Sequence, residues 1–399
     1  MKFADTLALD TYTKARSKVS AAATRAPILS ELVLNISEGC NLTCGYCFAK
    51  EGLYSEESPA WMSREHSYRY TQQMLESHPN ISRIKLFGGE PFMNIPAITG
   101  FVDAFEEHLA RNPDRHKQIS VGCVTNLTIY SAKLVDLIKR ANIRITASID
   151  GPREIHDLNR RFRNGRGSFD RIISVAKRYA DSGISIDGVE CVYSPAHKAA
   201  GISMLDLHEF ILSILNPRRV ILTPLQAALP DEHPEQVDFA AWIRETATDY
   251  VRECVRRKEE HVSYRAITED NLGVLFGPKS THGWCALGRS TCTVTADGTV
   301  VPCYTLLDHK NRWTLGHLSD TSFMPSMRSE DIFLELQQAT PLKASECQDC
   351  DIKEVCRGCP GAVYAQREVF TGRDSISCNY RIGSLEGLID GWKLTANQG

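Results

Sequence analysis

The chain has 399 residues, enough for two or three domains, and its 42% hydrophobic and 24% charged residues are typical of globular proteins. This balance excludes a disordered chain, a collagen-like repeat and a low-complexity filament. The net charge of -3 gives no broad positive field, so we expect neither nucleic acid nor an anionic membrane surface as a partner. No apolar run reaches the roughly eighteen residues of a membrane span, and Asp5 and Asp10 interrupt the apolar start, so we expect a cytoplasmic protein.

The order of apolar runs predicts a parallel sheet flanked by helices. Residues 1–30 are too few for a domain and form an N-terminal extension; from residue 31, β-branched runs alternate with amphipathic stretches, the pattern of βα units. We expect strands at 32–37, 83–87, 119–125, 144–149, 185–193 and 219–223, and helices at 63–77, 95–112, 131–141, 168–182 and 203–215. Asn94, just before Ile95 and Pro96, predicts a helix N-cap. Six βα units over residues 31–235 predict an α/β fold, a partial (β/α)6 barrel.

The sequence changes character after the predicted barrel. Residues 236–262 have the pattern of one long amphipathic helix, inside a helical linker that runs from 236 to 280. A region rich in cysteines and turns follows at 281–385, and a C-terminal tail at 386–399. We therefore expect a separate cysteine-rich domain after residue 280.

The 14 cysteines are clustered, and in a chain without a secretion signal such clusters bind metal more often than they form disulfides. Three lone ones, Cys123, Cys191 and Cys254, are predicted to be buried apolar residues. The first cluster, Cys40-x3-Cys44-x2-Cys47, directly follows the first predicted strand. Three thiolates on one loop hold three corners of a cubic iron-sulfur cluster and leave the fourth iron open for chemistry. The alternative, a structural zinc site, usually takes four ligands, and the loop has no histidine.

This triad, with Tyr46 before its last cysteine, resembles the radical S-adenosylmethionine (radical SAM) superfamily. The resemblance implies that SAM binds the open iron and that one electron cleaves it to a 5'-deoxyadenosyl radical. That radical abstracts hydrogen from an unactivated C–H bond. In a parallel αβ barrel the site lies at the carboxyl ends of the strands, so residues that follow each strand are the expected SAM contacts.

Motifs after the second, third and fourth strands match this expectation in order. The resemblance implies that Gly88-Gly89-Glu90-Pro91 receives the SAM amino group and that Thr125-Asn126 lies near the nucleoside. It further implies that Ser148 bonds the ribose and that Arg160 binds the SAM carboxylate, although Arg161 and Arg163 leave the choice of arginine open. The predicted cofactor contacts are Tyr46, Gly88, Gly89, Glu90, Asn126, Ser148 and Arg160.

The tail contains a second set of cysteines in the pattern Cys285-x6-Cys292-x5-Gly298-x4-Cys303, followed by Cys347, Cys350, Cys356, Cys359 and Cys378. It resembles the SPASM extension of radical SAM enzymes that modify peptides and proteins, which carries two auxiliary iron-sulfur clusters. The resemblance implies one cluster on Cys285, Cys292, Cys303 and Cys359 and another on Cys347, Cys350, Cys356 and Cys378, so that the chain holds three 4Fe-4S clusters. The short spacing from Cys356 to Cys359 departs from the family pattern and leaves this partition open. Two structural zinc sites are the alternative.

The substrate class follows from one position. SPASM-bearing relatives crosslink or epimerise peptides, or oxidise a cysteine or serine of a sulfatase to formylglycine. The sulfatase-maturing relatives have a catalytic aspartate directly after the cysteine of the Gly-x4-Cys element. Here that residue is Tyr304, whose phenol is not a base near neutral pH. We therefore expect a maturase that forms a carbon-carbon, ether or thioether crosslink in a ribosomally made precursor peptide. The alternatives are an anaerobic sulfatase-maturating, formylglycine-forming enzyme and, from a different class, a multicluster electron carrier or zinc-stabilised binding protein without SAM chemistry.

The expected partners are the precursor peptide and a reductant such as flavodoxin or ferredoxin. Because residues 1–30 are too short for a leader-binding domain, the leader would bind at the barrel mouth, at a sheet edge or on a separate protein. Glu190, alone in an apolar run, faces either the barrel interior or the surface, since a period of two does not choose the face. The sequence assigns no catalytic base.

Overall fold

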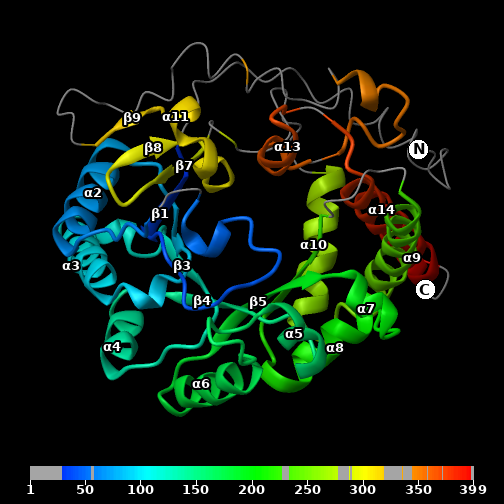
Figure 1. Cartoon of the computed structure of the whole chain (residues 1–399), viewed down its shortest axis with the longest axis horizontal. Helices are drawn as coiled ribbons and strands as arrows, with labels where there is room; N and C mark the ends of the chain where they lie inside the picture. The colour runs from blue at the N-terminus through cyan, green and yellow to red at the C-terminus, as the bar shows by residue number, and fades with distance from the viewer. Residues whose placement is uncertain are drawn as a thin grey trace. The chain divides into compact units, whose positions relative to one another are not determined.

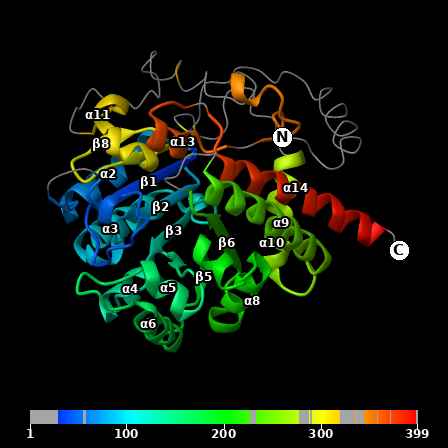
Figure 2. The same cartoon turned by 45° about the vertical axis from the view of Figure 1, so that its right-hand side comes forward.

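The computed structural model describes residues 29–54, 58–226, 233–276, 287, 290–318, 335, 344–356, 358–370 and 372–396 (Figures 1 and 2). The chain divides into two compact units. One comprises residues 25–189 and 286–336, and the other comprises residues 1–24, 190–285 and 337–399. The cysteine-rich region therefore contributes to both units, and the boundaries predicted for it stay predictions.

The first unit is built on a sheet whose parallel part has the order β4-β3-β2-β1-β7. Its strands are β1 (Glu31–Ser37), β2 (Arg83–Gly88), β3 (Ser120–Thr125), β4 (Arg144–Ser148) and β7 (Thr291–Val294). Val33 of β1 lies opposite Lys85 of β2 on one side and Thr293 of β7 on the other. Antiparallel β8 (Thr299–Val301) and β9 (Gly316–His317) continue the sheet beyond β7. The start of the cysteine-rich region thus extends the same sheet that carries β1.

Helices lie along the outside of this sheet (Figure 1). They are α2 (Arg64–Ser77), α3 (Ile95–Arg111), α4 (Ala132–Arg140) and α6 (Phe169–Asp181). The unit also contains α5 (Arg153–Asn159), α11 (Lys310–Trp313) and the short helical turns η1 (Lys50–Gly52), η2 (Pro91–Met93), η3 (Pro113–Arg115) and η4 (Tyr304–His309). Asn94 caps α3 as predicted, because its Oδ1 accepts a hydrogen bond from the Ala97 amide at 3.2 Å. Four predicted strands and four predicted helices of this unit lie within one residue of their expected bounds.

The second unit contains β6 (Arg219–Pro224) and the end of β5 (Ile186–Tyr193). Its helices are α7 (Pro195–Ala199), α8 (Met204–Leu215), α9 (Pro234–Arg256), α10 (Val262–Phe276), η5 (Ser345–Cys347), α13 (Pro360–Arg367) and α14 (Ser375–Ala396). Helix α14 runs along α9 (Figure 2), and glycines make the close approach possible. A Cβ on Gly383 would lie 2.3 Å from the carbonyl oxygen of Arg244, and one on Gly387 would lie 2.1 Å from that of Thr248.

The single helix predicted for residues 236–262 is wrong. Helix α9 ends at Arg256, the chain turns, and α10 starts at Val262. The break has a local cause, because the Nδ1 of His261 accepts a hydrogen bond from the Ser263 amide at 3.1 Å and so caps the second helix. The prediction that Cys123, Cys191 and Cys254 are buried is confirmed, with exposed fractions of 1%, 1% and 0%.

In the part of the chain that the structure describes, no helix is both long and apolar enough to cross a membrane. The cytoplasmic location stays a prediction.

Candidate active site

The cysteine triad lies on the loop that leaves β1. The loop is held on both flanks, because the Thr43 amide donates to the carbonyl oxygen of Arg161 at 2.8 Å and the Glu90 amide donates to that of Gly39 at 2.9 Å. The Sγ of Cys40 accepts hydrogen bonds from the Leu42 amide at 3.4 Å and from Asn126 Nδ2 at 3.6 Å. Such donors favour an anionic, ligated sulfur.

The thiols of the triad are partly buried. Burial, followed by the nearby Glu90, raises the pKa of Cys40 to about 12. Burial also raises the pKa of Cys44 to about 11, against the lowering effect of Arg160. Among the described residues, no three His, Cys, Asp or Glu side chains converge as ligands of a single metal ion. The fit to an iron-sulfur cluster therefore depends on three thiols with this spacing on one loop and on the N–H donors to Cys40.

The Gly88-Gly89 pair crosses the base of this loop. Gly88 has a φ of +148°, and a Cβ there would lie 2.2 Å from the carbonyl oxygen of Ser37. A Cβ on Gly89 would lie 2.4 Å from the carbonyl oxygen of Gly39, and the Gly89 amide donates to Ser37 at 2.7 Å. Only glycine permits this approach, so the pair fixes the start of the triad loop against the end of β2.

We expect Gly89→Ala to lower both the iron content and the rate of SAM cleavage, because its methyl group displaces the backbone just before Cys40. The destabilisation should be roughly 1–3 kcal/mol, the usual range for overpacking. Iron analysis and urea unfolding of the anaerobically reconstituted protein measure both effects. Gly273→Ala in α10 is the control, since nothing lies within 4 Å of its Cβ, and it should keep full iron and stability. Full iron in Gly89→Ala would contradict the expectation.

Glu90 is fully buried and ties the end of β2 to the end of β3. Its Oε1 accepts from the Phe92 amide at 2.9 Å and from Thr125 Oγ1 at 2.7 Å, and its Oε2 accepts from the Asn126 amide at 2.6 Å. Burial raises the pKa of Glu90 to about 7, and these three hydrogen bonds oppose the rise. The carboxylate thus has a positioning role, and the SAM contact predicted for Glu90 stays a prediction.

The raised pKa of Glu90 predicts a pH dependence of stability. Between its ordinary pKa and about 7, the folded state binds a proton that the unfolded state has released, so the free energy of unfolding should fall as pH rises. The slope is on the order of 1 kcal/mol per pH unit near pH 6. Urea unfolding at several pH values should show this slope in the wild-type protein and a shallower one in Glu90→Gln. Equal slopes would contradict the assignment.

Asn126 joins the end of β3 to the triad loop. Besides Cys40, its Nδ2 donates to Asn41 Oδ1 at 2.8 Å, and its Oδ1 accepts from Thr128 Oγ1 at 2.7 Å. Ser148 is the last residue of β4 and is half-buried. The triad loop, Glu90, Asn126 and Ser148 therefore follow four neighbouring parallel strands at the same edge of the sheet.

A buried ion pair lies beside the triad. The Nε of Arg160 donates to Asp150 Oδ2 at 2.9 Å, and the Tyr46 hydroxyl donates to the same oxygen. The guanidinium carbon also lies 5.4 Å from the centre of the Tyr46 ring. Arg160 is only 8% exposed and Asp150 only 2%. Tyr46 and Arg160, both predicted SAM contacts, are thus held together by an aspartate whose role the sequence did not indicate.

A hydrogen-bonded scaffold sets the position of Arg160. The Asp150 amide donates to His156 Nδ1 at 3.2 Å, His156 Nε2 lies 2.9 Å from Ser168 Oγ, and that hydroxyl donates to the carbonyl oxygen of Arg160 at 2.7 Å. Burial lowers the pKa of His156 to about 4, so the ring is neutral, as an Nδ1 acceptor requires. Among the three candidate arginines, Arg161 and Arg163 are exposed, and Arg163 pairs with Glu51 at 2.8 Å. The geometry therefore favours Arg160.

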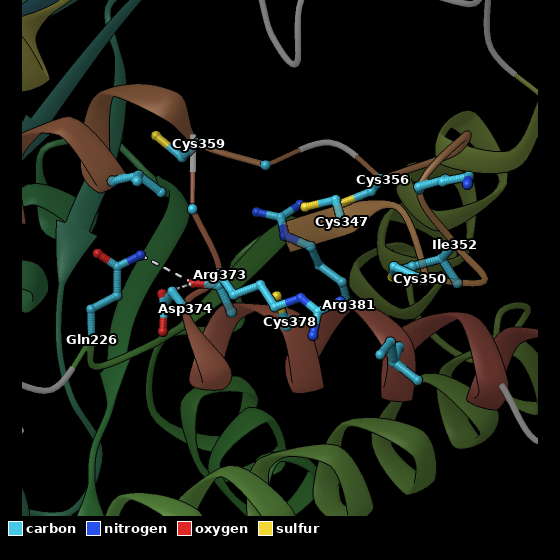
Figure 3. Close-up of a pocket in the computed structure, with 16 residues that line it drawn as sticks. Gln226, Cys347, Cys350, Ile352, Cys356, Cys359, Arg373, Asp374, Cys378 and Arg381 are labelled. Carbon is cyan, nitrogen blue, oxygen red and sulfur yellow. Dashed lines mark hydrogen bonds between the residues drawn. The ribbon is translucent and has the colours of Figure 1, made fainter. Parts of the chain in front are cut away.

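Five thiols of the cysteine-rich region line one pocket in the second unit, together with Arg373 and Arg381 (Figure 3). They belong to Cys347, Cys350, Cys356, Cys359 and Cys378. Burial raises the pKa of Cys378 to about 12, and the Cys356 and Cys350 thiols add to the rise. Cys359 is exposed and lies apart from Cys347 and Cys356 in Figure 3.

The remaining cysteines predicted as cluster ligands are in other places. Cys292 is buried on β7, and Cys303 precedes η4 and accepts a hydrogen bond from Thr305 Oγ1 at 3.3 Å. Both belong to the first unit. Cys285 lies outside the described residues, so the ligand set Cys285, Cys292, Cys303 and Cys359 stays a prediction.

Comparison with protein families identifies the two domains. Residues 34–193 match the sequence profile of the Radical SAM superfamily, and residues 285–360 match that of SPASM, an iron-sulfur cluster-binding domain. The chain contains a radical SAM domain followed by a SPASM domain. The two resemblances seen in the sequence are thereby confirmed, and the fold class is confirmed with them.

Known relatives of this radical SAM enzyme match most of its length. A cysteine-type anaerobic sulfatase-maturating enzyme of Clostridium perfringens (strain 13 / Type A) is 23% identical over 353 residues, which are 83% of this chain and 88% of the relative. The solved structure of native anSMEcpe with bound AdoMet has a TM-score of 0.73 at 18% identity and covers 93% of this chain and 100% of that one. Streptococcus suis SuiB bound to the precursor peptide SuiA has a TM-score of 0.59 at 15% identity, covering 88% and 76%. The radical SAM and SPASM domains of this chain imply SAM and 4Fe-4S clusters as its cofactors.

The structure locates two residues whose roles the sequence did not decide, Tyr304 and Glu190. Tyr304, directly after Cys303, is half-buried, and its ring centre lies 4.5 Å from that of Phe87. On β5, Cys191 and Tyr193 are buried, and the Tyr193 hydroxyl accepts from Trp242 of α9 at 2.9 Å. Glu190 is half-buried, and it lies on the opposite face of β5 from Cys191 and Tyr193. Its side chain therefore points away from α9.

Proposed function

We propose that this enzyme is a peptide maturase that forms a crosslink in a ribosomally made precursor peptide. The observation that carries the proposal is Tyr304. The residue that follows Cys303 is an aromatic ring packed against Phe87, and it provides no carboxylate to accept a proton from a substrate thiol or hydroxyl. Relatives with a solved peptide complex support a polypeptide as the substrate.

The proposed cofactor content is three 4Fe-4S clusters. The first would be held by Cys40, Cys44 and Cys47 and would leave one iron for SAM, and the reduced cluster with SAM supplies a 5'-deoxyadenosyl radical. Four of the five thiols that line one pocket, Cys347, Cys350, Cys356 and Cys378, would hold a second cluster. Cys285, Cys292, Cys303 and Cys359 would hold the third. Cys359 lines the same pocket as the second set, but it is exposed and lies apart from Cys347 and Cys356 in Figure 3, which supports this partition.

The residues of this chain have distinct parts in the proposed reaction. The Gly88-Gly89 backbone and the buried Glu90 fix the ends of β2 and β3, so that the triad loop and Asn126 keep one geometry. Arg160 would bind the SAM carboxylate through the guanidinium nitrogens that Asp150 does not engage. Ser148 would bond the ribose from the end of β4.

A second candidate function is formation of formylglycine in a sulfatase. It is favoured by the similarity to a sulfatase-maturating enzyme along 83% of this chain. With Tyr304 in place, another group would have to accept the substrate proton. The two candidates differ in their products, because a crosslink removes two hydrogens and retains sulfur, whereas conversion of cysteine to formylglycine removes the sulfur.

The test is an anaerobic reaction of reconstituted enzyme with SAM and a reductant such as flavodoxin, followed by mass spectrometry of the peptide. Candidate precursor peptides, each with its leader, and a cysteine peptide taken from a sulfatase are offered in parallel, with and without a separate leader-binding protein. Loss of two hydrogens from a precursor peptide supports the proposal. Loss of sulfur from the sulfatase peptide supports the second candidate, and no cleavage of SAM under any condition would overturn both.

A further inference from the structure

The two faces of β2 differ in kind. Ile84 and Leu86 are 2% and 0% exposed, whereas Lys85 and Phe87 between them are half-buried. Alternation along a strand places Lys85 and Phe87 on one face, opposite the two fully buried residues. At the same register position on β3 stands Gly122, whose Cβ would have one heavy atom within 4 Å, a backbone oxygen at 3.9 Å. The sheet is therefore open beside the Lys85 side chain.

Aromatic rings connect this face to the triad loop. The Tyr304 ring centre lies 4.5 Å from Phe87 and 6.2 Å from Phe48, and Phe48 is 51% exposed. Tyr304 and Cys47 pack against one apolar cluster, formed by Ala49, Tyr54, Val301 and Leu307. The rings of Phe48, Phe87 and Tyr304 thus form an aromatic strip that starts next to Cys47.

Lys85 places a cation on this strip. Its Nζ lies 5.4 Å from the centre of the Tyr304 ring and 6.0 Å from that of Phe87. In the part of the chain that the structure describes, no carboxylate lies within ion-pair distance of Lys85. The neighbouring cations differ, because Lys50 pairs with Asp308 at 3.1 Å and Arg163 pairs with Glu51 at 2.8 Å. A half-buried ammonium against aromatic rings has lost part of its hydration, which makes a carboxylate a favourable ligand.

We propose that Lys85, Phe87 and Tyr304 form a substrate subsite that binds an acidic side chain of the peptide, Asp or Glu, close to the residue that is modified. This inference rests on the proposed peptide substrate and specifies its chemistry. The ammonium pairs with the carboxylate, while the methylene groups of the acidic side chain lie along the rings. Phe48, at the exposed end of the strip, covers the neighbouring peptide residue.

The test uses a display library of random short peptides, selected anaerobically on the reconstituted enzyme with SAM. We expect bound peptides to be enriched in Asp and Glu on the wild-type protein and on Lys85→Arg, and to lose this enrichment on Lys85→Gln. Lys177→Gln is the matched control, because Lys177 is exposed and pairs with Asp181 on the surface of α6. Iron content and thermal unfolding establish that each variant is folded and loaded.

A second measurement needs no variant. The most enriched peptide is synthesised with its Glu and with Gln in the same place, and binding to wild-type enzyme is followed by fluorescence anisotropy. The Gln peptide should bind about tenfold more weakly, as expected for loss of one charge-assisted contact. Equal binding of the pair, or the same acidic enrichment on Lys85→Gln, would overturn the subsite and leave the peptide function standing. Failure of the wild-type and control proteins to select any peptide would overturn the proposed function and the subsite together.

Discussion

Simultaneous replacement of Cys40, Cys44 and Cys47 by alanine should lower the iron content from about 12 to about 8 atoms per chain, the loss of one cubic cluster. Cleavage of SAM should fall below detection, since the open iron is lost with the cluster. Iron, sulfide and zinc are measured on anaerobically purified and reconstituted protein, beside 5'-deoxyadenosine formation. This is the largest effect that we expect from any change in the chain.

Cys191→Ala is the matched control for the triad variant. Cys191 is 1% exposed and belongs to neither predicted cluster, so its loss should leave about 12 irons and normal SAM cleavage. If the wild-type protein contains about 4 irons, together with zinc bound by the later cysteines, the radical chemistry of the triad stands and the assignment of the auxiliary iron-sulfur clusters is overturned. Unchanged iron in the triple variant would overturn the assignment of the triad.

The strands of the barrel were predictable because each carries its own local pattern. Residues 83–87, for example, alternate fully buried side chains with exposed or half-buried ones, and β2 has the expected start. The pairing of β1 with β7 was not predictable. Val33 and Thr293 are separated by more than half of the chain, and no local periodicity records which distant segments share a ladder. The break after Arg256 was missed because a histidine cap resembles an ordinary polar residue within an amphipathic pattern.

The sequence predicted which residues form the candidate site, but it predicted the roles of those residues less well. Cys40, Cys44 and Cys47 stand out by spacing alone. The sequence did not indicate that Glu90 accepts three hydrogen bonds from residues at the ends of β2 and β3. From sequence alone, a carboxylate in a turn is equally well interpreted as a ligand-binding group. Lys85 was missed for a similar reason, since a lysine within a strand usually marks a solvated face. Tertiary packing, rather than sequence order, assigns these roles.

Asp150→Ala should destabilise the protein by roughly 3–5 kcal/mol, because it leaves the buried guanidinium of Arg160 without its counter-ion. The Tyr46 hydroxyl loses its acceptor in the same variant. SAM binding should weaken as well, since Arg160 is no longer held beside the triad. Urea unfolding and equilibrium binding of SAM to the reconstituted protein measure the two effects separately. Asp170→Ala is the control: it breaks the exposed pair with Arg153, and such pairs contribute at most about 1 kcal/mol.

A double variant, Asp150→Ala with Arg160→Met, separates the electrostatic contribution of the ion pair from the contribution of its packing. If the cost of Asp150→Ala comes from an unpaired buried charge, removing that charge in Asp150→Ala with Arg160→Met should recover part of the lost stability. SAM binding should not recover, because the proposed ligand of its carboxylate is then absent. Destabilisation that adds for the two substitutions would mean that Asp150 contributes through packing alone. Full SAM binding by the double variant would overturn the assignment of Arg160 and return the choice to Arg161 and Arg163, the exposed arginines that follow it.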